Sequence, residues 1–230
     1  QEPKLRLVIK ETCQKLRGLP LNDLFGERIR AANLTDDEMR YMVEILGAMP
    51  NATVRQARHL DLRFSFPSLN ASQGFALGCW LQRFDGDSLR LAECGGLLKG
   101  PGIGNVLRGL GSCQLQLKHL DLCATQLSKV EAPALSKLLS SCQLETLNLA
   151  FNERLMTCEA LQGLADALEG EKCVLSELVL KHCNISGKAG QPLGLWLRHI
   201  PCLRELNLNW NPEILSSRGL RGLFAGLSSC

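Results

Sequence analysis

Leucines recur along the chain in a fixed local pattern, in which one leucine is followed three and then five residues later by two more. The pattern is clearest in segments that begin at Leu117, Leu144, Leu175 and Leu203. Apolar and polar residues alternate in its central part, which predicts a short β-strand with its leucines turned toward a core. The middle leucine returns about every 30 residues, which indicates a structural repeat. Its successive positions are Ile29, Leu60, Leu89, Leu120, Leu147, Leu178 and Leu206.

A second apolar pattern follows each predicted strand after a polar linker. Apolar residues recur there at positions i, i+3, i+4 and i+7, which is typical of one buried face of a helix. Examples are Leu161, Leu164, Ala165 and Leu168, and later Leu220, Leu223, Phe224 and Leu227. A single strand and helix cannot bury their own apolar faces, so neighbouring units must stack strand beside strand and helix beside helix.

This stacking predicts an α/β solenoid, with a curved parallel sheet on the concave side and helices on the convex side. Residues 27–230 form the repeat domain of about seven units, and we expect it to continue beyond the given chain. Residues 1–26 are predicted to form an N-terminal helical cap or a partial repeat.

The segments L-x-x-L-x-L-x-x-N/C, the unit length and the full helix in each unit resemble the ribonuclease-inhibitor type of leucine-rich repeat. The resemblance covers about residues 27–230 and is most specific in the last four units. Such repeats occur in ribonuclease inhibitor, NOD-like receptor sensors, Ran GTPase-activating protein, tonsoku-like proteins and axonemal regulatory subunits. The resemblance implies protein binding. It also implies that an Asn or Cys ties down the backbone after each strand, so Thr125 and Ser65, which depart from this pattern, predict weaker local order.

Composition and charge exclude some classes of function. The chain is 45% hydrophobic and 21% charged, which is typical of a folded domain, and its net charge of +3 does not favour nucleic acid. No apolar run approaches the roughly 18 residues of a membrane helix, so we expect no membrane partner.

Eleven cysteines raise the choice between disulfides and reduced thiols. Five of them follow a leucine-rich segment at similar intervals, which predicts one shared packing role and a reduced, cytoplasmic chain, with a nuclear or ciliary location as a further possibility. They are Cys113, Cys142, Cys173, Cys202 and Cys230. Four N-glycosylation sequons, at Asn33, Asn51, Asn70 and Asn184, keep an extracellular receptor open as an alternative.

A glycine-rich stretch, GGLLKGPGIGNV from Gly95 to Val106, has the composition of a phosphate-binding loop. It lacks the third glycine of the dinucleotide fingerprint and the Gly-Lys-Ser/Thr ending of the Walker motif. Its place between a predicted strand and a predicted helix favours a plain connecting loop. Neighbouring His182 and Cys183 should point to opposite faces, and the histidines lie on separate units without metal-ligand spacing. We therefore expect no catalytic residue, no metal and no cofactor.

The outward positions of the strands are the remaining candidate site. The early units are rich in arginine and the last is polar and acidic, and aromatic and arginine side chains on a rigid scaffold are common interface anchors. The predicted partner-binding residues are Arg28, Arg30, His59, Arg63, Arg90, His119, Lys181 and Trp210. Packing of Phe151 and Trp210 against neighbouring loops is an equally weighted interpretation.

These observations predict a non-catalytic protein–protein interaction scaffold within a larger intracellular protein or complex. The partner is expected to be a protein. The arginines would attract an acidic partner, and Trp210 would serve as an apolar anchor. Neither a small-molecule substrate nor nucleic acid is expected. A GTPase-activating or immune-sensor-type leucine-rich-repeat domain is the alternative function.

Overall fold

The computed structural model describes residues 58–62, 71–82, 84, 86–92, 102–111, 116–171 and 173–228. The predicted N-terminal cap over 1–26 and the first unit around Ile29 lie outside these residues. The elements are β1 (His59–Asp61), α6 (Ala71–Leu81), β2 (Ser88–Arg90), α7 (Gly102–Leu110), β3 (His119–Asp121), α8 (Ala132–Ser141), β4 (Thr146–Asn148), α9 (Cys158–Leu168), β5 (Glu177–Val179), the short 3-10 helix η1 (Gly187–Ala189), α10 (Gly190–Arg198), β6 (Glu205–Asn207) and α11 (Ser217–Ser228).

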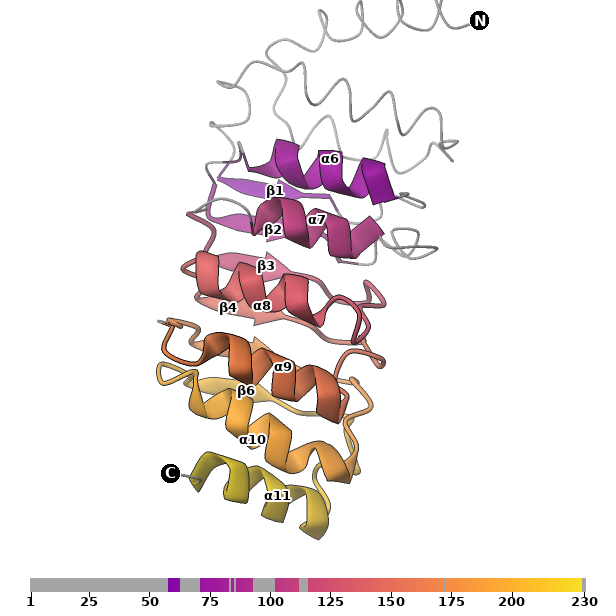
Figure 1. Cartoon of the computed structure of the whole chain (residues 1–230), viewed down its shortest axis with the longest axis vertical. Coiled ribbons are helices and arrows are strands. Elements are labelled where there is room, and N and C mark those ends of the chain that lie inside the picture. Colours follow the sequence, from indigo (N-terminus) through magenta and orange to yellow (C-terminus); the bar gives the residue numbers. More distant parts are fainter. Residues whose placement is uncertain are drawn as a thin grey trace, which may run out of the picture.

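The strands form one parallel sheet whose order follows the sequence from β1 to β6. The middle leucines stand opposite one another in register, from Leu60 beside Leu89 through to Leu178 beside Leu206. Figure 1 shows the helices as a layer on one face of this sheet. The predicted α/β class and the pairing of the leucine strands are confirmed.

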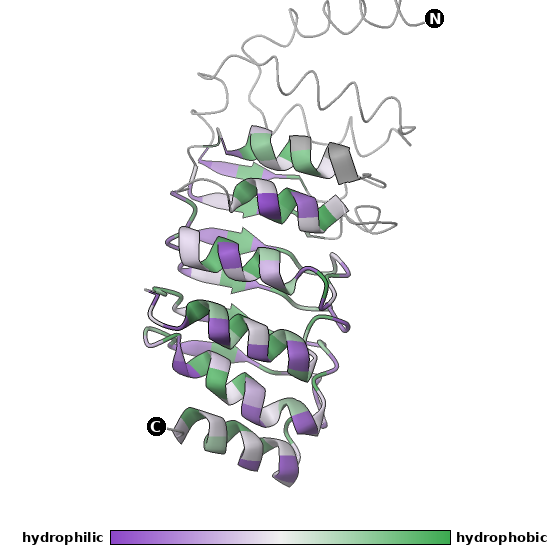
Figure 2. Ribbon diagram, viewed as in Figure 1, coloured by the Kyte–Doolittle hydropathy of each residue, from purple (hydrophilic) through white to green (hydrophobic). Residues whose placement is uncertain are grey.

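The core lies between the sheet and the helix layer. Leu89, Leu147 and Leu178 are at most 1% exposed, and the helix leucines meet them from the other side. Figure 2 shows hydrophobic and hydrophilic residues alternating along the helices, as the i, i+3, i+4, i+7 pattern predicts.

Helix α11 departs from its predicted buried face. Leu223 is buried, but Phe224 is 62% exposed and Leu227 is 40% exposed. The physical reason is that α11 packs on α10 and no further described helix covers its other side. The same holds for Leu206 in β6, which is only half-buried.

A tight turn follows each of the strands β3 to β6. Three residues after the end of each strand, one residue has a positive φ angle, between 52° and 62°, in the left-handed region that side chains rarely adopt; the turns after β3 and β5 hold a second such residue, Gln126 and Asn184. The residues at the shared position are Ala124, Phe151, His182 and Trp210. Because the conformation recurs at one register position, it belongs to the repeated fold.

The residue after each left-handed position is buried and ties the turns together. Asn152 donates from Nδ2 to the carbonyls of Leu122 and Leu149, both at 2.9 Å, and accepts from the Leu127 N–H at 2.8 Å. Its carboxamide therefore bridges two consecutive units. The expectation of weaker local order at Thr125 is wrong, because its buried hydroxyl donates to the Leu122 carbonyl at 2.7 Å. Ser65 lies outside the described residues.

The glycine-rich stretch is not simply a loop. Gly102 and Gly104 lie in the first turn of α7, which corrects the prediction for the end of the stretch, while residues 93–101 lie outside the described part. A Cβ atom placed on Gly74 of α6 would overlap the carbonyl oxygen of Gly102. Glycine is needed here because the two helix backbones touch, and this close approach outweighs the poor helix propensity of glycine.

The predicted shared role of the periodic cysteines is only partly correct. Cys142 and Cys173 are buried, whereas Cys202 is exposed, and Cys113 and Cys230 lie outside the described residues. All cysteines that the structure describes are free thiols. Within the same part of the chain, every helix is too short or too polar to cross a lipid bilayer.

Candidate functional site

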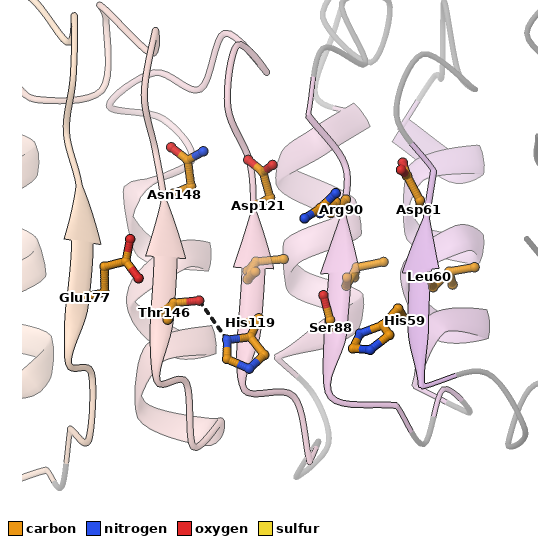
Figure 3. Close-up of a pocket in the computed structure, with 12 residues that line it drawn as sticks. His59, Leu60, Asp61, Ser88, Arg90, His119, Asp121, Thr146, Asn148 and Glu177 are labelled. Atoms are coloured by element: carbon orange, nitrogen blue, oxygen red, sulfur yellow. Dashed lines mark hydrogen bonds between the residues drawn. The ribbon is translucent and has the colours of Figure 1, made fainter.

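The strand face, meaning the side of the sheet opposite the helices, carries two rows of outward side chains. Each strand contributes the residue before and the residue after its middle leucine, since side chains alternate along a strand. The first row is His59, Ser88, His119, Thr146, Glu177 and Glu205, and the second is Asp61, Arg90, Asp121, Asn148, Val179 and Asn207. Figure 3 shows members of both rows side by side on adjacent strands.

A shallow hollow of about 700 Å³ runs over β1 to β5 on this face. We call it the strand-face hollow. It is lined by both rows and brings together three of the predicted partner-binding residues, His59, Arg90 and His119. Arg28, Arg30 and Arg63 lie outside the described residues.

Neighbouring side chains orient both histidines of the hollow. His59 Nδ1 lies 3.3 Å from Asp87 Oδ1, and His119 Nδ1 lies 2.9 Å from the Thr146 hydroxyl. Each ring is therefore oriented by a group from the next unit and lines the hollow.

The second row contains side chains that hold the turns, a role that the sequence reasoning missed. Asp121 Oδ1 accepts a hydrogen bond from the Cys123 N–H, Asn148 Oδ1 accepts one from the Ala150 N–H, and both bonds are 3.0 Å long. Asn207 makes the same bond to the N–H of Asn209. The signal was present in three units as an Asp or Asn three residues before the left-handed turn position. Arg90 stands in the same row, cannot accept such a bond, and extends as an exposed cation.

The described strand face carries more carboxylates than cations, whereas the sequence predicts arginine-rich first units. Arg90 supplies its cation, while Asp61, Asp121, Glu177 and Glu205 supply carboxylates. The described part is therefore net acidic. Of the arginines predicted for this face, Arg90 lies on its described part, and Arg28, Arg30 and Arg63 lie outside the described residues.

A second hollow of about 740 Å³ lies at the rim of the sheet, beyond the carboxyl ends of β5 and β6. We call it the rim hollow. Its lining includes Glu153, His182, Asn184, Trp210, Pro212 and Leu215. The Trp210 side chain is 71% exposed, and none of the lining residues belongs to the strand-face hollow.

Lys181 belongs to a small stack beside the rim hollow. The rings of Phe151 and His182 are stacked with centroids 5.0 Å apart, and Lys181 Nζ lies 5.7 Å from the centre of the Phe151 ring. Phe151 thus packs on the neighbouring turn, which was one of the two interpretations of this aromatic position. The predicted partner-binding set therefore splits between two surfaces, with Trp210 on the second.

Buried Cys183 shows no sign of an activated nucleophile. Its side chain is fully buried while that of His182 is half-exposed, so the two diverge as the sequence predicts. Burial raises the pKa of the Cys183 thiol to about 11, which keeps it protonated. In the described ranges, no three His, Cys, Asp or Glu side chains are grouped as metal ligands would be.

The chain was compared with known protein families and known proteins. No family model matches the chain. It is 33% identical over 132 residues to the protein named ribonuclease inhibitor from Mus musculus. The match covers 56% of this chain and 28% of that protein, so the chain spans less than a third of the relative's length. The repeated strand and helix units and this partial similarity to ribonuclease inhibitor together support a leucine-rich-repeat arrangement.

Proposed function

We propose that this chain is a leucine-rich-repeat solenoid that binds a protein partner along its strand face and has no catalysis of its own. The observation that carries the proposal is the strand-face hollow, where polar side chains stand uncovered above fully buried leucines. Because the sheet holds these side chains in place, a partner would bind with little ordering cost. The relative named ribonuclease inhibitor supports a binding role, since its name describes an inhibitor of another protein.

The partner is a protein with an acidic segment toward the N-terminal end of the strand face. Arg90 stands there between Asp61 and Asp121, so the positive charge of this end would come mainly from Arg28, Arg30 and Arg63, while Glu177 and Glu205 make the opposite end acidic. This gradient would orient a partner that carries both signs of charge. The proposed partner-binding residues are Arg28, Arg30, His59, Arg63, Arg90, His119, Lys181 and Trp210.

The domain belongs to a larger intracellular protein or complex, in the cytoplasm with a nuclear or ciliary location as the alternative. The free thiols of all described cysteines support a reducing compartment. A glycan on the exposed side chain of Asn184 in native material, detected by mass spectrometry, would contradict this part of the proposal.

Chemical cross-linking of native material followed by mass spectrometry tests the function directly. A partner cross-linked to residues next to the strand-face hollow is expected. The captured partner should then bind the double variant Arg63→Glu and Arg90→Glu at least about tenfold more weakly, because two attractive charges become repulsive. The variant Arg108→Glu is the matched control, since Arg108 is exposed on helix α7, on the other side of the sheet. Equal binding by the double variant and the control would refute the proposed surface.

A further inference from the structure

Arg90 departs from a rule that most of its row on the strand face follows. In β3, β4 and β6 this position holds Asp121, Asn148 or Asn207, and each side chain accepts a hydrogen bond from the N–H two residues later. Val179 of β5 lacks an acceptor too, but it is a half-buried apolar side chain. Arginine has only donors, so β2 forgoes the turn bond and exposes a charge instead. A residue that breaks such a local rule of the repeat points to function.

The Arg90 guanidinium is not used inside the domain. It makes no ion pair or hydrogen bond with the described residues, although Asp61 and Asp121 stand on the strands to either side. The Ser88 hydroxyl, two residues earlier on the same face of β2, is likewise without a partner in the described part of the chain, and both side chains line the strand-face hollow (Figure 3). A guanidinium offers two parallel N–H donors to a carboxylate, and a neighbouring hydroxyl offers a third. Strand β2 therefore presents a set of unfilled donors.

The two carboxylates beside Arg90 limit which anion fits these donors. The pairing register places Asp61 and Asp121 opposite Arg90 on neighbouring strands, which lie about 4.8 Å apart in a sheet. A run of acidic side chains, or a phosphate with nearly two negative charges, would be repelled by both carboxylates. A single Asp or Glu side chain fits best, with a basic group next to it that faces Asp121. Oδ1 of Asp121 accepts the Cys123 N–H, which leaves Oδ2 for such a group.

We propose that Arg90 and Ser88 bind one Asp or Glu side chain of the protein partner, while Asp121 binds a Lys or Arg side chain beside it. This inference rests on the proposed function and deepens it, because it names the pair of opposite charges that the partner presents above β2 and β3. Side chains four residues apart on a helix are separated by roughly 5 to 6 Å, close to the spacing of neighbouring strands. A helix that crosses the strands can therefore present both groups.

Helical peptides serve as probes, so the test does not need the partner. Four blocked alanine-rich peptides of equal length carry Glu–Lys, Glu–Gln, Gln–Lys or Glu–Glu at positions i and i+4, together with the same uncharged fluorophore. Fluorescence anisotropy measures their dissociation constants. The Glu–Lys peptide should bind at least about threefold more tightly than each of the others. The Glu–Glu peptide would bind best if a general attraction to arginine governed this surface, so equal or tighter binding of that peptide would overturn the inference.

The variant Arg90→Asn separates a binding role from a structural one. Asparagine restores the acceptor found in β4 and β6, so the urea midpoint of unfolding should rise or stay the same, while the Glu–Lys peptide should bind at least about threefold more weakly. The matched control is Val179→Asn, which introduces the same side chain at the same position of β5 and should leave peptide binding unchanged. A lower midpoint in Arg90→Asn, undiminished peptide binding, or equal weakening in the control would overturn the inference.

The outcomes distinguish this inference from the proposed function. If the Glu–Lys peptide does not bind, while the double variant Arg63→Glu and Arg90→Glu still weakens the cross-linked partner, the inference alone fails. If the peptides bind as expected but no partner cross-links beside the strand-face hollow, the proposed function alone fails.

Discussion

Replacing Asn152 with alanine tests how consecutive units of the sheet are held together. The carboxamide is fully buried and bonds to the turn of its own unit and to the turn of the preceding one. Alanine removes all of these bonds while preserving the backbone and leaving the leucine core in place.

The expected loss of unfolding free energy depends on which backbone groups are left without any hydrogen-bond partner when the carboxamide is removed. The carbonyls of Leu122 and Leu149 each keep another side-chain donor, a hydroxyl at 2.7 Å and a thiol at 3.2 Å. The Leu127 N–H donates to Asn152 Oδ1 at 2.8 Å. It has no other acceptor among the described residues, so in the variant it would stay buried without a partner. One orphaned donor costs about 1 to 3 kcal/mol, and the other lost bonds and the small cavity raise the expected loss to roughly 2 to 5 kcal/mol.

Urea unfolding followed by circular dichroism measures this loss, and Asn148→Ala is the matched control. Asn148 is half-buried and accepts one hydrogen bond, from the Ala150 N–H, so its loss should cost about 0.5 to 1.5 kcal/mol. Faster amide exchange at Leu127 in Asn152→Ala would locate the effect. A loss below about 1 kcal/mol, or one no larger than that of the control, would refute the bridging role of the carboxamide.

Three further perturbations follow from the same structure. Gly74→Ala should lower the free energy of unfolding by about 1 to 3 kcal/mol, because its Cβ meets the Gly102 carbonyl, whereas Gly163→Ala, which meets nothing within 4 Å, should raise it by about 0.5 to 1 kcal/mol; a Gly74→Ala chain as stable as the parent would contradict the backbone contact. Burial raises the pKa of Cys183 from 9.0 to about 11, so its contribution to stability is complete below about pH 9 and is lost as pH rises toward 11; unfolding curves across this range should change less steeply with pH in Cys183→Ala, and an unchanged slope would argue against it. Trp210→Ala should change the unfolding free energy by less than about 1 kcal/mol, since the indole is 71% exposed; a larger loss of stability would show that the indole is structural.

The strand register could be predicted because the leucine period imposes it directly. A strand whose middle leucine must face a shared core can pair with its neighbour in one register only, since a shift by one residue would turn the leucines outward. The period also marked His59, Arg90 and His119 as outward residues that share one surface, and the structure places all three around the strand-face hollow.

Features that depend on a neighbouring unit could not be predicted in this way. Periodicity shows which face of α11 is apolar, but whether Phe224 is covered depends on what packs beside it. Gly102 was assigned to a loop because it lies between a predicted strand and a predicted helix, and the contact with Gly74 explains its place in α7 despite the low helix propensity of glycine. Phe151 was equally compatible with an interface role and with packing, and its stacking is explained by the following unit, which supplies the His182 ring and the Lys181 ammonium.

The left-handed backbone position after each strand is set by the repeat and not by the side chain that occupies it. Ala124, Phe151, His182 and Trp210 all hold positive φ angles at the same place in successive units, so the strained backbone is a property of the repeat. Ala124 forms this turn with a single methyl group, which shows that the turn does not need a ring. The buried side chain that follows, such as Asn211 behind Trp210, secures the backbone whatever the left-handed residue is. The fold therefore leaves the identity of this side chain free, since the methyl group of Ala124 and the indole of Trp210 occupy the same backbone position.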